Sequence, residues 1–291
     1  MKKVYLLAGT SILLWASAAA LVKILLTGLD SMQISLFSSG FAFLFMLAWN
    51  IGTKNMKKWK LYKIKDYIQM SGIGLLGIFF YYLFLYLAID SLLAQEAFII
   101  NYLWPIMTVL FACLLLKEKM TLRKGIALFL SFIGVVVVMT RGDILHFRAD
   151  NVKGVVFAVL AAVFFGLYAV LNKRKGYDKQ FSIMICFLVS FLVSLAYVLI
   201  RKDLPQINGT QILGLLWNGI FVNAIAQTTW LLALQKGNTA KISNLAFITP
   251  FLSLVYIYVF LHEVIGLYSL AGLTVIILGI VIQMKDTQPN T

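Results

Sequence analysis

The sequence predicts an all-α polytopic membrane protein: ten transmembrane helices form two inverted five-helix repeats around a central cavity. The prediction depends on composition, on the spacing of apolar segments and on an internal repeat. The 291 residues are 62% hydrophobic and only 12% charged, with a mean hydropathy of +0.92. Because no soluble fold of this size could bury so much apolar surface, the bilayer must be the solvent.

Ten apolar segments predict the helices, since a membrane-spanning helix needs about 20 residues. Taken in order, each lies between two charged or turn-rich breaks, the first of them at Lys2 and Lys3. The spacing leaves too few residues for an extramembrane domain. The predicted helices are 4–26, 31–51, 67–88, 92–116, 122–140, 154–173, 181–200, 211–234, 240–261 and 267–284.

The net charge of +14 is best explained by the loops. With the N-terminus inside, 19 of the 25 Lys and Arg residues fall on the inner side, and Lys23 lies within the first helix. This bias predicts a multi-pass protein of the plasma membrane with both termini cytoplasmic. It favours the lipid bilayer and a small-molecule substrate as partners, and not nucleic acid. The five outer residues are Arg141, Arg148, Lys153, Arg201 and Lys202.

The sequence offers no catalytic or metal-binding constellation. Cys113 and Cys186 lie in apolar segments without metal spacing, and the two histidines, His146 and His262, are separated in the topology. An intramembrane enzyme would need a nucleophile with a base, or metal ligands, on facing helices. We therefore expect neither an enzyme nor a cofactor.

The second half of the chain repeats the first. An offset of 145 residues matches Pro105 to Pro250, Glu118 to Glu263 and Gly134 to Gly279, and an offset of 150 matches Lys23 to Lys173. The repeats are predicted at 1–140 and 154–291, joined by an outer linker at 141–153. Each holds five helices, an odd number, so the second is inverted. Inverted repeats are typical of transporters with a site near the midplane and alternating access.

Polar residues in membrane helices usually face a cavity or a neighbouring helix. Asn223, Gln227 and Trp230 are spaced to share one helical face, where they could bind the carboxylate and amine of an amino acid. The alternative is interhelical hydrogen bonding, worth about 0.6 kcal/mol per contact.

The fourth helix of the first repeat carries the stretch Asn101-Tyr102-Leu103-Trp104-Pro105. A proline removes a helical hydrogen bond and frees a carbonyl for a ligand or a neighbour. Because Pro250 repeats the feature, both prolines are predicted hinges, and Asn101, Tyr102 and Trp104 are predicted to line the cavity.

Aromatic residues from other helices complete the predicted site. Trp15, Tyr82 and Tyr168 could stack on an aromatic side chain or hold a quaternary ammonium by cation–π attraction. Simple packing or an interfacial belt is the alternative for any single ring. Glu96 and Lys23 lie near the outer surface, where Lys23 can snorkel, and proton coupling does not follow from the sequence.

Two motifs carry a resemblance to a known family. Leu116-Lys117-Glu118-Lys119-Met120-Thr121-Leu122 with Gly125 and Gly134, and Leu261-His262-Glu263-Val264 with Gly272 and Gly279, resemble the EamA family of the drug/metabolite transporter superfamily. Residues 101–105 resemble aromatic amino acid exporters of the YddG type, although Leu245 to Pro250 depart from that pattern. The resemblance implies an inner-membrane exporter of amino acids or related metabolites.

The sequence leaves several alternatives open. Transport of another metabolite such as a quaternary amine, in either direction, fits the same aromatic residues. An intramembrane enzyme is the remote alternative, and a homodimer remains open.

Overall fold

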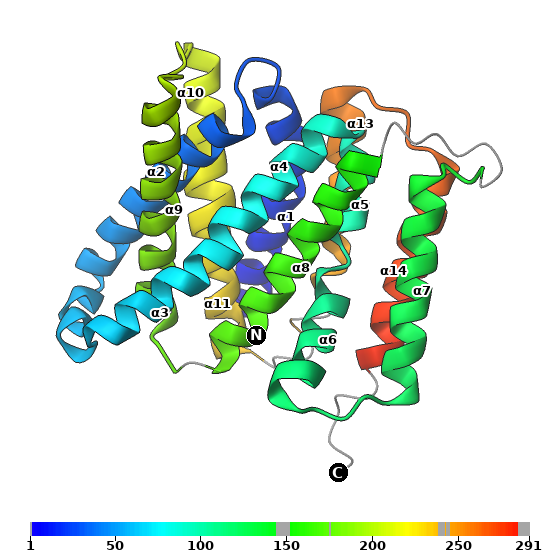
Figure 1. Cartoon of the computed structure of the whole chain (residues 1–291), viewed down its shortest axis with the longest axis horizontal. Helices are drawn as coiled ribbons and strands as arrows, with labels where there is room; N and C mark the ends of the chain where they lie inside the picture. Colours follow the sequence, from blue (N-terminus) through cyan, green and yellow to red (C-terminus); the bar gives the residue numbers. More distant parts are fainter. Residues whose placement is uncertain (1, 144–151, 175, 238–241, 243–244, 285–291) are drawn as a thin grey trace.

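A computed structural model describes residues 2–143, 152–174, 176–237, 242 and 245–284 of the chain and folds them into a bundle of helices (Figure 1). The first half comprises α1 (Lys2–Leu25), α2 (Ser31–Gly52), the 3-10 turn η1 (Asn55–Leu61), α3 (Ile64–Gly74), the π-helical η2 (Leu75–Phe80), α4 (Tyr81–Ser91), α5 (Ala94–Asn101), α6 (Trp104–Leu116) and α7 (Leu122–Met139). The second half comprises α8 (Val152–Arg174), α9 (Lys179–Arg201), α10 (Gly209–Leu216), the π-helical η4 (Trp217–Ile225), α11 (Ala226–Lys236), α13 (Ile248–Leu261) and α14 (Leu267–Met284).

The prediction of ten spanning helices is confirmed in part. Among the described residues, eight helical stretches are long and apolar enough to cross a membrane, and two further apolar helices, 248–261 and 267–282, are shorter. The predicted helix at 240–261 lies partly outside the described residues, and a turn at Ala246 and Phe247 interrupts it. Within the described residues, the continuous part of this helix is α13.

Local signals explain several helix ends. Asp30 accepts hydrogen bonds from the backbone N–H groups of Met32 and Gln33, and the Gln33 side chain accepts one from the Asp30 N–H, which forms a capping box at the start of α2. At helix C-termini, Lys117 (φ 57°) ends α6 and His262 (φ 54°) ends α13, both in the left-handed conformation. These residues lie 145 positions apart, so the repeat extends to backbone conformation.

The bundle has two distinct ends. The connections at 53–63, 117–121 and 176–178 gather where α1 begins, and we call this the lysine-rich end. The connections at 26–30, 92–93, 202–208 and 262–266 gather at the opposite, lysine-poor end (Figure 1). The end of α1 and the start of α8 both lie beside Leu92, which contacts Lys23 and Gly154. The first helices of the two halves therefore run in opposite directions.

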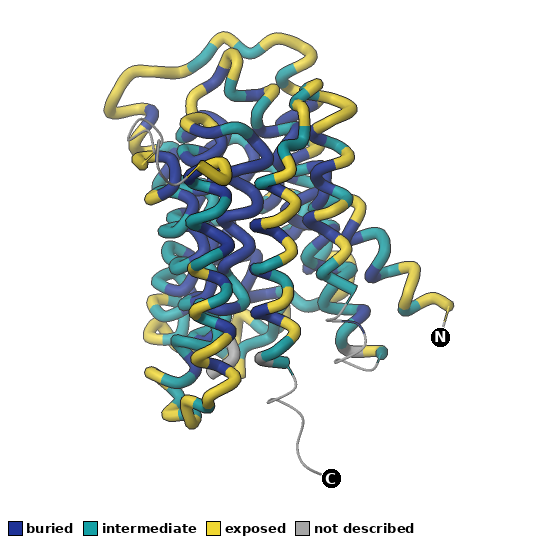
Figure 2. The backbone as a smooth tube through the Cα atoms, turned by 90° about the vertical axis from the view of Figure 1, so that its right-hand side faces the viewer, coloured by how far each residue is buried: buried dark blue, intermediate teal, exposed yellow. Residues whose placement is uncertain are grey.

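The most extensive helix contacts join one half to the other and occur in matched pairs. The helices α7 and α14 pack together, as do α2 and α9. The contact of α4 with α8 is matched by that of α1 with α11, and that of α6 with α8 by that of α1 with α13. Buried residues concentrate in the interior of the bundle, whereas exposed residues mark the loops and the outer faces (Figure 2). The clusters of buried residues therefore draw on both halves.

Small residues permit the closest of these contacts. A Cβ atom placed on Gly134 of α7 would lie 2.8 Å from the carbonyl oxygen of Gly272 on α14. A Cβ atom on Gly279 would likewise lie 2.8 Å from the carbonyl oxygen of Ala127. Both contacts obey the 145-residue offset, since Gly134 matches Gly279 and Ala127 matches Gly272. Close backbone approach through small residues is the usual way in which membrane helices associate.

Candidate functional site

The candidate site lies where a helix of each half is interrupted. The chain turns at Tyr102 and Leu103 between α5 and α6, and again at Ala246 and Phe247 before α13. A proline, Pro105 or Pro250, follows each turn as the second or third residue of the next helix. Interrupted helices at matched positions of two repeats are the feature with which many transporters build a site near the midplane.

A single hydroxyl joins the two interruptions. Pro250 has no N–H to donate to the carbonyl of Ala246, four residues earlier. The Tyr102 hydroxyl donates a hydrogen bond to that carbonyl oxygen over 2.8 Å. The reciprocal bond does not form, because the residue that matches Tyr102 is Phe247, which has no hydroxyl. The carbonyl of Asn101, which Pro105 deprives of its helical donor, is left without this partner.

Two π-helical turns shape the walls of the site. η2 precedes α4 in the first half, and η4 precedes α11 in the second, at positions that the repeat relates. A π-helical turn widens the helix and frequently marks a functional position. The residues that follow are Tyr81 and Tyr82 on α4 and Ala226 and Gln227 on α11. Tyr82 and Gln227 occupy the same repeat position, and the Gln227 side chain interacts with the Tyr82 hydroxyl.

An aromatic cluster spans three helices. The ring of Phe165 on α8 lies 4.8 Å from Tyr81, 5.0 Å from Trp104 and 5.8 Å from Tyr168, measured between ring centroids. Tyr82 lies 4.8 Å from Tyr81 on α4. The angles between the planes are tilted or edge-on, which is the arrangement that aromatic rings prefer. Phe165 is therefore the centre of the cluster.

Trp15 and Trp230 form a second aromatic contact. Their ring centroids lie 5.3 Å apart, and the planes are tilted by 59°. One turn away, the hydroxyls of Ser11 and Thr229 lie 2.7 Å apart and share a hydrogen bond. This contact joins α1 to α11, and Trp230 lies three residues after Gln227. The tryptophan pair therefore adjoins the Tyr82–Gln227 contact.

Two buried amide oxygens near these rings make no hydrogen bond to any described residue. They are Oδ1 of Asn101 and Oδ1 of Asn223, and the two residues are 3% and 1% exposed. The Asn101 amide nitrogen donates to the Tyr81 hydroxyl over 3.4 Å. A buried polar atom without a partner costs about 1 to 3 kcal/mol. Such atoms are candidates for contact with a ligand that offers N–H or O–H groups.

Neutral groups line the candidate site. Within the described spanning helices, the acidic residues Asp66, Asp90 and Glu96 all lie in a first or last turn. The polar groups near the aromatic rings are amides and hydroxyls. A ligand held here would meet dipoles and ring faces, without a full counter-charge on the protein.

The structure brings most of the predicted residues into contact, either directly or through one other side chain. Trp15 meets Trp230, Tyr82 meets Gln227, and Trp104 and Tyr168 meet through Phe165. Asn223 interacts with the Tyr86 hydroxyl one turn from Tyr82. Four of the nine predicted residues are buried and five are partly exposed. The buried ones are Asn101, Tyr102, Tyr168 and Asn223.

Sequence reasoning missed Asn218 and the role of Phe165. The Asn218 amide nitrogen donates to the hydroxyls of Ser38 and Tyr86, each over 2.9 Å, and the residue is 1% exposed. The signal was an isolated asparagine in an apolar segment. The face of the helix on which Asn218 lies could not be predicted, because the α-helical periodicity used for Asn223 does not hold in the π-helical turn at 217–225.

A polar network closes the lysine-poor end around the start of α5. Glu263, from the loop before α14, accepts hydrogen bonds from the backbone N–H groups of Ala94 (3.0 Å) and Gln95 (3.3 Å). The Gln95 side chain donates to the carbonyl of Val264 and accepts from the Ser269 hydroxyl. A carboxylate at a helix N-terminus is stabilised by the helix dipole. These contacts all cross between the halves.

Glu96 and Arg141 extend the network. The Arg141 Nε donates to Glu96 Oε1 over 2.7 Å, and the Tyr268 hydroxyl lies 3.3 Å from the same oxygen. The hydrogen bond between Arg141 and Glu96 raises the pKa of the Arg141 guanidinium above its ordinary value. Glu96 is only 3% exposed, so its carboxylate depends on these partners.

Lys23 binds the C-terminal end of α4 through its ammonium group. Its Nζ donates to the carbonyl oxygens of Ile89 (2.6 Å) and Leu92 (2.8 Å), at the C-terminal end of α4. Helix C-termini present unpaired carbonyls and the negative end of the dipole, which attract a cation. Lys23 is therefore bound inside its own half at the lysine-poor end.

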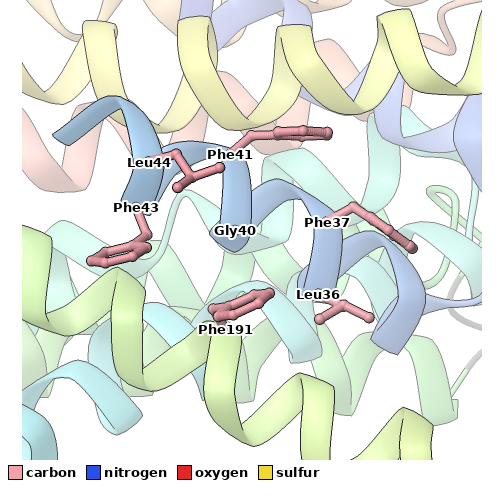
Figure 3. A pocket seen from close by; sticks show the side chains of 7 residues that line it. All are labelled: Leu36, Phe37, Gly40, Phe41, Phe43, Leu44 and Phe191. Atoms are coloured by element: carbon pink, nitrogen blue, oxygen red, sulfur yellow. The ribbon is translucent and has the colours of Figure 1, made fainter. Parts of the chain in front are cut away.

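A separate hollow of about 190 Å³ lies between α2 and α9, away from these groups (Figure 3). The Phe191 ring lies against Gly40, with its Cδ2 3.0 Å from where a Cβ would be. The lining of the hollow is apolar and offers no polar contact to a small molecule. The lining residues are Leu36, Phe37, Gly40, Phe41, Phe43, Leu44 and Phe191.

Interrupted helices, matched π-helical turns and a buried site between two repeats define a class of protein, the membrane transporters. Comparison with known proteins narrows the class. A sequence model of the EamA-like transporter family matches residues 2–140 and again residues 152–284. The chain belongs to this family, whose members are transporters and not enzymes.

Relatives cover most or part of the chain. An uncharacterized transporter of Archaeoglobus fulgidus is 23% identical over 96% of both chains. The aromatic amino acid exporter YddG of Ancylobacter novellus is 26% identical over 64% of each chain, and the uncharacterized transporter YvbV of Bacillus subtilis is 29% identical over 60% of this chain and 58% of its own. A solved crystal structure with 22% identity aligns with a TM-score of 0.69 over 98% of this chain and 97% of that one, which supports the fold.

Proposed function

We propose that the protein is a secondary transporter that exports aromatic or other amphipathic amino acids and related metabolites by alternating access. The observation that carries the proposal is the pair of unpartnered amide acceptors, Asn101 Oδ1 and Asn223 Oδ1, beside an aromatic cluster. A substrate ammonium could donate to such oxygens. A substrate ring could stack with Phe165 or Tyr82, because both already adopt tilted contacts that an added ring can extend.

The neutral lining favours a substrate with no net charge. A zwitterionic amino acid carries both charges together, and amide dipoles can bind its two ends without a buried ion on the protein. The partial similarity to an aromatic amino acid exporter supports the same substrate class. A quaternary amine is the second candidate, because the Trp15 and Trp230 rings could hold it by cation–π attraction.

Export requires an orientation, and the charge distribution supports one. We propose that the lysine-rich end faces the cytoplasm of a cell whose plasma membrane holds the protein. The lysine-poor end, with the Glu263–Gln95 network, then faces outwards. Substrate would enter from the lysine-rich end while this network holds the other end closed.

Uptake into liposomes tests the proposal. Purified protein is reconstituted, and flux of labelled phenylalanine, tyrosine and tryptophan is compared with that of leucine and choline, with and without a pH gradient. We expect saturable flux of the three aromatic amino acids above that of choline. Saturable choline flux alone would favour the quaternary amine, and no flux above that of empty liposomes, with folded protein, would contradict both.

A further inference from the structure

The segment between α2 and α3 is a second feature with the properties of a binding surface. It carries five lysines, and a sixth, Lys65, lies in the first turn of α3, so that six fall within twelve residues. Lys58 forms an ion pair with Asp178, in which Nζ lies 2.6 Å from Oδ2. The other five are exposed, and none of them pairs with a carboxylate of a described residue. They are Lys54, Lys57, Lys60, Lys63 and Lys65.

The conformation of the segment brings two of these lysines together. η1 is a 3-10 helix, in which residues three apart lie on one face, so Lys57 and Lys60 are neighbours. Lys54, with φ 59°, makes the turn from α2 into η1. With Met56 and Trp59, the two lysines line a hollow of about 530 Å³. The Lys60 Nζ lies 5.8 Å from the centroid of the Trp59 ring.

The body of the protein holds this hollow in place. The Asn55 amide donates to Gln180 Oε1 over 2.8 Å, and the Tyr67 hydroxyl donates to the carbonyl oxygen of Trp59 over 2.9 Å. Met56 packs against the core between α2, α3 and α9. The lysines and Trp59 therefore project from an anchored turn and not from a free loop.

Because two candidate spanning helices meet there, we expect the hollow to lie at the level of the membrane surface. α2 ends at Gly52 and α3 begins at Ile64. Side chains next to the hollow are apolar and exposed: Leu61 is 73%, Ile64 77% and Ile68 66% exposed. Such exposure in a membrane protein indicates contact with lipid. Tryptophan is enriched at the boundary between headgroups and acyl chains, and Trp59 is 56% exposed.

We propose that this hollow binds the headgroup of an anionic phospholipid, which we call the η1 lipid site. Lys57 and Lys60 bind the phosphate, and Trp59 lies at the boundary between headgroup and acyl chains. The positive charge and the adjoining lipid-facing residues favour a lipid over a free anion. Clusters of lysines next to a spanning helix attract anionic lipids in this way. The inference is independent of which substrate the protein transports.

Lipid retention tests the η1 lipid site directly. The protein is taken from nanodiscs that contain equal amounts of phosphatidylglycerol and phosphatidylcholine, and the bound lipids are counted by native mass spectrometry. We compare wild type with K57Q/K60Q and with the control K117Q/K119Q, which removes two exposed lysines from another loop at the same end. We expect K57Q/K60Q to lose phosphatidylglycerol by about fivefold or more, and the control to stay within about twofold of wild type.

A second measurement locates the lipid. The tryptophan emission that Trp59→Phe removes is assigned to Trp59, and its quenching by brominated phosphatidylglycerol and brominated phosphatidylcholine is compared. We expect stronger quenching by the anionic lipid, reduced in K57Q/K60Q. Equal phosphatidylglycerol retention in wild type and K57Q/K60Q, or displacement of the lipid by inorganic phosphate, would overturn the proposal.

Discussion

Tyr102 contributes a hydroxyl to a carbonyl that a proline has left without its helical donor. Tyr102→Phe removes the hydroxyl donor to the half-buried Ala246 carbonyl, which then keeps the hydrogen bond from the Thr249 N–H. We expect the free energy of unfolding to fall by about 1 kcal/mol, as for one hydrogen bond in a membrane protein. Thermal unfolding in detergent measures this. Tyr258→Phe, at a residue 59% exposed on α13, is the matched control and should change nothing.

Substitution of Asn101 can distinguish a role in substrate binding from a role in stability. Its Oδ1 is buried without a partner and its amide nitrogen makes the long 3.4 Å bond to Tyr81, so Asn101→Leu removes a costly unpaired atom together with one weak hydrogen bond. We expect the variant to unfold at the same temperature or higher, while saturable flux of phenylalanine falls by about tenfold, or about 1.4 kcal/mol of lost binding. Unfolding and flux are measured on one preparation. Normal flux would remove Asn101 from the proposed site.

Trp230→Ala tests the tryptophan pair in the same assay. The change removes the ring that lies 5.3 Å from Trp15, and such a pair contributes about 0.5 to 1.5 kcal/mol beyond the area that it buries. If the pair binds substrate, the KM for phenylalanine should rise while the protein remains folded. Trp217→Ala, on the same stretch of helix but 41% exposed, is the control.

At the scale of helices, the contact of α7 with α14 depends on the absence of a side chain. In Gly134→Ala the new methyl group would lie 2.8 Å from the carbonyl oxygen of Gly272, so the helices must separate. We expect a loss of about 1 to 3 kcal/mol in the free energy of unfolding. Gly125→Ala lies on the same helix with no atom within 4 Å, and should be neutral or slightly stabilising. Equal stability of the two variants would contradict this account.

The sequence was sufficient to place the helices but not their irregularities. Apolar segments bounded by charge locate most helix ends within a few residues, because burial in a bilayer depends on length and composition. The π-helical turns are not visible in a sequence, since a wider turn needs no particular residue. The interruption at Tyr102 was predicted only as a kink at Pro105, because a proline indicates a lost hydrogen bond and not where the chain turns.

The side-chain contacts at the ends of the bundle were likewise not predictable from the sequence. The sequence placed Lys23 and Glu96 near one surface but could not supply their partners. Lys23 binds carbonyl oxygens, which carry no sequence signal, and Glu96 binds Arg141, 45 residues away. The repeat matched Glu263 to Glu118, but the contact of Glu263 with α5 depends on the packing of the two halves. Trp104 and Tyr168 meet through Phe165, whose residue type alone indicates only packing.

At the scale of the whole molecule, Glu263 holds the two halves together at the lysine-poor end. Glu263→Gln removes the charge that binds the N-terminus of α5 and should favour opening of that end. Accessibility is read from Ala97→Cys, a buried position on α5, in a chain with Cys113→Ser and Cys186→Ser. We expect labelling by a membrane-impermeant thiol reagent to rise about tenfold, which is the effect of about 1.4 kcal/mol.

Glu118→Gln is the matched control, because Glu118 occupies the repeat-related position. It pairs with Lys124 of its own half over 3.4 Å, with its side chain 38% exposed. Labelling of the thiol introduced by Ala97→Cys should not change in this variant. If both variants leave the labelling unchanged, the Glu263 contact does not hold the lysine-poor end closed.

The pairing of helices between the halves has a consequence for assembly. In each major helix contact, one helix lies in residues 2–139 and the other in residues 152–284. Cleavage of the chain between α7 and α8 would therefore give two pieces, each without the helices that nearly all of its own helices pack against. Neither piece could form a compact bundle alone, but together, inserted in opposite orientations, they could reconstitute it. The intact chain behaves as an antiparallel dimer whose subunits are covalently tethered. Its denaturation should therefore proceed as one cooperative transition, and not as two.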